Sequence, residues 1–122
     1  MSCEFRHQNN GLHVQITGVW TPEDMVQRAN ALEAYPASLA CCITDCRGVQ
    51  DHLITPLHLE FIKNLEFALS LSHPTTKRVF IAEAPDTRAL LEALLHGLDD
   101  GHAPHICATE QDARSHLGVS TI

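Results

Sequence analysis

The sequence predicts an α/β protein in which a mixed five-stranded sheet and four helices follow one another in the order β-β-α-β-α-β-α-β-α. Short apolar runs alternate along the chain with longer segments of helical periodicity. Each long segment begins at a helix-start motif that contains proline or threonine. Strands that alternate with helices require a sheet with helical layers, and we expect the strands after an opening hairpin to be mostly parallel.

The opening hairpin is predicted from two short strands on either side of Asn9-Asn10-Gly11. Residues 3–7 alternate weakly between apolar and polar, and residues 12–17 alternate clearly. Asparagine and glycine tolerate the positive φ angles that a tight hairpin turn needs. We therefore expect the first two strands to pair antiparallel.

The first helix is predicted to begin at Thr21-Pro22-Glu23-Asp24 and to end before Pro36. Threonine caps free amides, proline suits the first helical position, and acidic residues favour the positive end of a helix. Residues 39–45 then form a short apolar run that fits a central strand covered on both faces.

A second helix is predicted from Thr55-Pro56 to Ser72-His73-Pro74. Its expected apolar face consists of Leu57, Phe61, Leu65 and Ala68, widened by Ile62 and Leu69.

The last third of the chain repeats the alternation. Residues 78–82 read as a buried strand, and Pro85-Asp86 opens a leucine-rich helix that Asp99-Asp100-Gly101 closes. Residues 105–108 form a short last strand. Thr109 to Asp112 resembles a capping box, and Gly118 is suited to end the fourth helix.

Composition limits the classes of function. With 122 residues, 44% of them hydrophobic, residues 1–122 fit one globular domain. A net charge of −7 argues against binding to nucleic acid or to an acidic membrane. The chain has no apolar stretch long enough to span a membrane and does not begin with a signal peptide, so we expect a cytoplasmic protein. The five cysteines are expected to be free thiols, and no cofactor or metal is expected.

Several segments resemble the SpoIIAA-like family, a branch of the STAS domains (sulfate transporter and anti-sigma factor antagonist). The resemblance includes Ile16-Thr17-Gly18 and the Thr-Pro-Glu helix start that follows it. It continues through Ile43-Thr44-Asp45-Cys46-Arg47-Gly48 and includes the closing segments 108–113 and 116–118. It covers nearly the whole chain and implies the mixed five-stranded STAS fold.

The resemblance also implies a function. STAS proteins are generally not enzymes, and those of anti-sigma pathways are switched by phosphorylation of a serine or threonine after the third strand, at the start of the next helix. Thr55 stands at that position here. The family's phosphosite motif reads Asp-Ser-Ser-Gly or similar, whereas this chain has Leu53-Ile54-Thr55-Pro56, without the acidic residue and the glycine.

Residues 45–55 form the candidate binding site, predicted as a loop that leaves a strand and enters a helix. Ligands of open α/β sheets gather at the carboxyl ends of strands, and free amides at a helix start attract anions. Arg47 offers a planar cation for a carboxylate or phosphate. In the alternative interpretation, Asp45 and Arg47 pair with each other or with the loop backbone, and Thr55 is a plain helix cap. The expected partner is a protein or a small anionic or hydrophobic ligand.

Other interpretations remain open. The helices at 57–71 and 88–98 have broad apolar faces that either pack on the sheet or hold a lipid or a second copy of the chain in a homodimer. Cys46 with His52 or His58 offers a thiol nucleophile and a base, although such pairs arise easily by chance among five cysteines and nine histidines. The segment from His102 to Cys107 holds three residues of metal-ligand type, for which a structural role is the simpler interpretation. We therefore expect a non-catalytic binding module.

Overall fold

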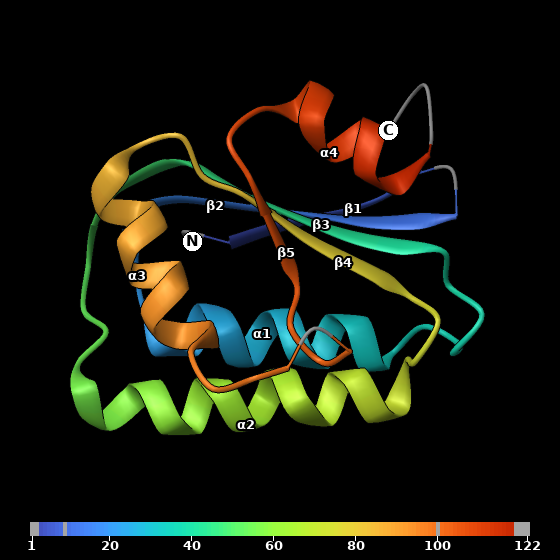
Figure 1. The fold of residues 1–122 in the computed structure, drawn as a ribbon, viewed down its shortest axis with the longest axis horizontal. Coiled ribbons are helices and arrows are strands. Elements are labelled where there is room, and N and C mark those ends of the chain that lie inside the picture. The colour runs from blue at the N-terminus through green and yellow to red at the C-terminus, as the bar shows by residue number, and fades with distance from the viewer. Residues whose placement is uncertain (1–2, 9, 100, 119–122) are drawn as a thin grey trace.

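A computed structural model describes residues 3–8, 10–99 and 101–118, and it contains the predicted elements in the predicted order (Figure 1). The five strands are β1 (Cys3–Gln8), β2 (Gly11–Trp20), β3 (Cys41–His52), β4 (Lys77–Ile81) and β5 (His105–Cys107). The four helices are α1 (Pro22–Glu33), α2 (Pro56–Ser72), α3 (Pro85–Leu95) and α4 (Glu110–Leu117).

The five strands form one mixed sheet in the order β1-β2-β3-β4-β5. The β1 and β2 strands pair antiparallel from Cys3 opposite Ile16 to Gln8 opposite Gly11, which confirms the predicted hairpin. The expected turn residue Asn9 lies outside the described residues, whereas Asn10 has the positive φ of 58° that the turn requires. All other neighbouring strands are parallel, so β1 and β5 form the two edges of the sheet.

The helices cover the two faces of the sheet unequally (Figure 1). Helices α1, α2 and α3 lie on one side, where the larger core includes Trp20, Leu32, Ile62, Phe80 and Leu91. Helix α4 lies on the other side and packs over β4 and β5 through a smaller core that includes Ala113 and Leu117. The part of this second face formed by β1 and β2 therefore remains exposed.

The predicted helix starts are confirmed where threonine caps the helix. The Thr21 amide donates to Asp24 Oδ2 at 2.8 Å, and the Asp24 amide donates to Thr21 Oγ1 at 3.3 Å. At α4 the Asp112 amide donates to Thr109 Oγ1 at 3.1 Å, and Gly118 ends the helix with a φ of 72°. Both caps satisfy amides that have no partner inside the helix.

We predict that Thr21→Ala lowers the free energy of unfolding by about 1 kcal/mol, because it removes the oxygen that accepts from the Asp24 amide. Thr21→Ser retains this oxygen and is expected to unfold close to the wild-type midpoint. Urea unfolding followed by circular dichroism measures the difference. Equal midpoints for the alanine and serine variants would contradict the stabilising role of the cap.

Two predicted boundaries are wrong. Helix α3 ends at Leu95, before the predicted stop at Asp99-Asp100-Gly101. Gly97, with a φ of 91°, takes the chain out of the helix, and Asp100 itself lies outside the described residues. The third strand does not give way to a loop at Asp45 but continues to His52.

Strand β3 is long because β2 offers it a partner along its whole length, as far as Trp20 opposite His52. The register between the two strands shifts between Gln15 and Thr17, and again between Gly18 and Val19. Such β-bulges add residues to one strand without ending the ladder. Of the predicted loop 45–55, only residues 53–55 lie between β3 and α2.

The predicted apolar face of α2 is also largely wrong. Ile62 and Leu69 are buried as expected, but they share the buried face with Glu66 and Ser70. Three residues assigned to the core face, namely Leu57, Phe61 and Ala68, are exposed instead. Helix α2 therefore presents apolar side chains to solvent and a carboxylate to the interior.

A buried ionic network explains this orientation of α2. Glu66 accepts hydrogen bonds from Arg28 of α1 and Arg78 of β4, and Arg28 also donates to Thr44 Oγ1 at 2.7 Å. All four residues are buried, and the Arg28 guanidinium lies 4.6 Å from the ring centre of Phe80. A buried carboxylate needs such partners. The network therefore ties α1, α2 and the sheet together.

Candidate functional site

Asp45 and Arg47 contact each other across the first bulge of β3. Arg47 donates from its amide to Asp45 Oδ1 at 3.0 Å, from Nε to the same oxygen at 2.9 Å, and from Nη2 to Oδ2 at 2.7 Å. Although burial raises the pKa of the Asp45 carboxyl, the hydrogen bonds from Arg47 outweigh it and lower this pKa. The alternative to ligand binding was a pairing of Asp45 with Arg47, and the structure contains it. The ionised Asp45 carboxylate and Arg47 hold the two ends of the bulge together.

Asp45 and Arg47 also line a polar pocket of about 440 Å³, which lies on the exposed part of the sheet beside α4. Its lining includes Arg6 and His13, which are not among the predicted site residues, and Arg6 Nη2 lies 3.1 Å from His13 Nδ1. The alternation of residues 12–17 predicts His13 and Gln15 on the polar face of β2. Only the strand register shows that this face adjoins Asp45.

Thr55 does not line this pocket. It stands at the start of α2, where it is exposed, and its amide donates to His58 Nδ1 at 3.0 Å. The Thr55 hydroxyl oxygen lies 3.1 Å from the same ring nitrogen. His58 thus takes the place that glutamate has in an ordinary capping box. The structure therefore places the three predicted site residues at two separate locations.

Three exposed apolar side chains lie within six positions of Thr55 in the sequence. Leu53 is 62% exposed, Leu57 89% and Phe61 48%. We call these three residues the entry patch, because they lie where the chain enters α2. The apolar spacing of α2 predicts core positions for Leu57 and Phe61, so their exposure was not expected from the sequence. Grouped large apolar side chains on a surface commonly mark an interaction site.

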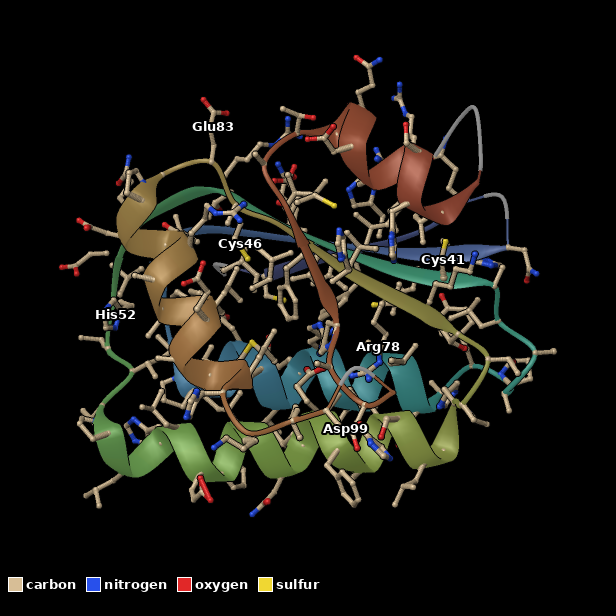
Figure 2. All side chains as sticks on the ribbon, viewed as in Figure 1. Cys41, Cys46, His52, Arg78, Glu83 and Asp99 are labelled. Carbon is tan, nitrogen blue, oxygen red and sulfur yellow. The ribbon has the colours of Figure 1, made fainter. Side chains whose placement is uncertain are left out.

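The thiol chemistry considered for Cys46 has no support in this geometry. Cys46 is 1% exposed, and burial strongly raises the pKa of its thiol, opposite to the lowered pKa that a nucleophilic cysteine needs. Figure 2 shows Cys46 inside the molecule and His52 on its outer side. His52 Nδ1 instead accepts from the Ile54 amide at 3.1 Å, while His58 is occupied at Thr55.

Two residues of the candidate segment from His102 to Cys107 make structural contacts. His102 Nδ1 lies 2.5 Å from Asp99 Oδ1, and Cys107 is buried against α4. Within the described ranges, no three histidine, cysteine or acidic side chains are grouped so as to hold a metal ion. Leu91, Leu94 and Leu95 of α3 are buried in the larger core, so they account for the apolar face of that helix by packing.

Comparison with known proteins identifies the fold. No family model and no curated protein matches the sequence. Among solved structures, the chain resembles the unphosphorylated anti-sigma factor antagonist SpoIIAA, with a TM-score of 0.60 and 9% identity over 95% of this chain and 97% of that one. An anti-sigma factor antagonist from Mycobacterium paratuberculosis gives 0.64 and 20% over 95% and 92% of the two chains.

A third structure is an uncharacterized DUF3478-family protein with a SpoIIAA-like fold from Shewanella loihica. It gives a TM-score of 0.53 and 14% identity over 94% of this chain and 91% of that one. The chain therefore has the SpoIIAA-like fold, as the sequence resemblance implied. Across the described residues, the structure contains no helix that is both long and apolar enough to cross a membrane.

Proposed function

We propose that this protein is a non-catalytic regulatory module whose protein partner docks on the entry patch beside Thr55. The observation that carries the proposal is the exposure of Leu53, Leu57 and Phe61 at one end of a fold whose interior is otherwise well packed. Leaving three large apolar side chains in water forgoes the burial energy of each, about 1.5–3 kcal/mol per fully buried side chain. A partner that covers them recovers part of that energy.

The likeness of the fold supports one class of partner. The matched structures include two anti-sigma factor antagonists, one of them described in its unphosphorylated form. This likeness supports a protein of the anti-sigma factor kind as the partner. The net charge of −7 and the buried Cys46 thiol also fit a binding module better than a nucleic-acid-binding protein or a thiol enzyme.

In this proposal, Asp45 and Arg47 contribute to partner docking at a second location, away from the entry patch. The Arg47 side chain is 36% exposed beside the polar pocket, and Asp45 accepts two hydrogen bonds from this side chain and one from the Arg47 amide. We expect the pair to hold the strand segment that leads to the entry patch and to offer a partner the exposed edge of the guanidinium. Arg47 is therefore expected to affect docking less than Leu57.

We predict that Leu57→Asp weakens binding of an anti-sigma factor encoded in the same genome by about ten-fold or more, because it puts a charge into the apolar contact. Isothermal titration calorimetry of the purified proteins measures the affinity. The matched control is Leu71→Asp, at the other end of the same helix, where the native leucine is 61% exposed. We expect this control to bind within about two-fold of wild type.

Two results would overturn this assignment of the docking surface. One is an equal loss of affinity in Leu57→Asp and Leu71→Asp, which would mean that the contact is not confined to the entry patch. The other is wild-type affinity in Leu57→Asp, provided that its unfolding midpoint matches that of the wild type.

Phosphorylation of Thr55 is the regulatory step we propose for the same surface. A phosphate brings roughly two negative charges, which the start of a helix tolerates but an apolar contact does not. We predict that protein carrying phosphothreonine at position 55, installed by codon expansion, binds the same partner at least about ten-fold more weakly. Thr55→Val, which cannot be phosphorylated, is expected to bind like wild type. Equal affinities of the phosphorylated and unmodified proteins would contradict the switch.

A further inference from the structure

A second, basic pocket lies at the opposite end of α2, well removed in sequence from the entry patch. It has a volume of about 390 Å³ and lies between the beginnings of β4 and β5, the residues after α2, and α4. Its charged and titratable lining consists of His73, Lys77, Arg78, His105 and His116. No carboxylate is among the described lining residues, although acidic residues outnumber lysine and arginine by 15 to 8 in the whole chain.

On the α4 side of the sheet, the pocket has two histidines and a lysine. The rings of His105 and His116 stack with their centres 4.0 Å apart and their planes 7° from parallel. Burial, the neighbouring His105 and the Lys77 ammonium together lower the pKa of His116. Protonation of His116 is thus opposed by burial and nearby positive charge, and an anion that enters the pocket favours it.

On the other side of the sheet, the buried ionic network extends to the pocket through Arg78, which lines it. Arg78 donates to Glu66 and, from Nη2, to the His102 carbonyl oxygen at 2.5 Å. Glu66 is shared with Arg28, so two buried guanidinium groups contact one carboxylate. Burial and the charge of Arg28 lower the pKa of Arg78 despite Glu66. The pocket therefore lies beside a buried network in which two guanidinium groups share the Glu66 carboxylate.

Two other titratable groups near the pocket, His73 and Asp99, have hydrogen-bond partners of their own. His73 Nε2 donates to the Tyr35 carbonyl oxygen at 2.9 Å, and His73 Nδ1 lies 2.9 Å from Ser72 Oγ. Asp99, on the loop before β5, is hydrogen-bonded to His102 Nδ1 and to the Gly101 amide. An anion in the pocket would meet cations on both sides without facing a carboxylate from the described lining.

We propose that the basic pocket binds a small organic phosphate through Lys77, Arg78 and the His105–His116 pair. Its volume falls within the range of about 300–1,000 Å³ typical of small-molecule sites, which leaves room for an organic group beside the phosphate. Lysine and arginine are the usual phosphate partners. Because bound dianion favours protonated histidine, affinity is expected to rise as the pH falls from 8 to 6.

Calorimetry at constant ionic strength tests the proposal, with sulfate as the first probe because its charge does not change between pH 6 and pH 8. We expect sulfate to bind more tightly at pH 6, and Lys77→Gln to weaken binding about ten-fold. Lys63→Gln is the matched control, since Lys63 pairs with Glu60 on α2 and does not line the pocket. His116→Gln is expected to flatten the pH dependence. Equal losses in Lys77→Gln and Lys63→Gln, or no sulfate binding at pH 6, would overturn the site.

Ribose 5-phosphate and inorganic phosphate then distinguish the source of the anion. Tighter binding of ribose 5-phosphate supports an organic phosphate, whereas equal affinities would overturn that assignment. The residues of the entry patch do not line the basic pocket, so these measurements do not depend on them. Failure of the basic pocket therefore leaves the proposed docking function untouched.

Discussion

Glu66→Leu is expected to lower the free energy of unfolding by about 3–5 kcal/mol, the cost of breaking a buried ion pair by removing one partner. Glu66 is 1% exposed and is the carboxylate that both Arg28 and Arg78 contact. Its loss leaves two buried guanidinium groups without an anion. Guanidinium chloride unfolding followed by tryptophan fluorescence reports on the core through Trp20.

Glu60→Leu provides the matched control for Glu66→Leu. Glu60 lies on the same helix with a side chain that is 76% exposed, and its ion pair with Lys63 is on the surface. Such pairs contribute about 0–1 kcal/mol. Glu66→Gln keeps the shape of the side chain and part of its hydrogen bonding. Its loss of unfolding free energy is therefore expected to lie between those of Glu66→Leu and Glu60→Leu, and it remains measurable if Glu66→Leu does not fold. Equal midpoints for Glu66→Gln and Glu60→Leu would contradict the compensating role of Glu66.

Phe80→Ala is expected to cost about 3–5 kcal/mol, the usual range for removing a buried phenylalanine ring. Phe80 is fully buried in the larger core, and its ring lies against the Arg28 guanidinium. The variant loses both the burial and the cation–π contact, and it leaves a cavity below the ionic network. Thermal and denaturant unfolding measure the loss.

Phe80→Leu separates the two contributions. It refills most of the cavity but removes the aromatic face, so we expect a loss of about 1–2 kcal/mol, made up of imperfect packing and the cation–π term. If Phe80→Leu were as unstable as Phe80→Ala, cavity formation would not explain the effect. If it were as stable as wild type, the contact with Arg28 would contribute nothing.

Local sequence patterns predicted the elements whose determinants are local. Thr21 and Thr109 cap helices with partners three residues away, and Asn10 turns the chain between two strands that are neighbours in sequence. The length of β3 depends instead on Trp20, which is 32 positions from its partner His52. In the sequence, a short apolar run followed by polar residues looks like a strand that ends. In the structure the strand continues, because bulges allow the polar residues to stay in the ladder.

The same reasoning explains the outcome for the candidate site. The contact between Asp45 and Arg47 joins residues two positions apart, and it was considered from sequence as an alternative. The exposure of Leu57 was not predicted from the sequence, because apolar spacing alone assigns this leucine to the core. Glu66 belongs on the buried face only because Arg28 and Arg78 meet it there, 38 and 12 positions away in sequence. Hydrophobic periodicity contains no information about such partners.

The two edges of the sheet restrict how a partner is recognised. Strand β5 is three residues long, and the outward residues of β1 include the exposed charged side chains Glu4 and Arg6. Short or charged edges disfavour the addition of a strand from another chain, and so also edge-to-edge aggregation. Recognition by β-augmentation is therefore not expected. We therefore expect specificity to depend on individual surface side chains, so that a few surface substitutions would redirect it.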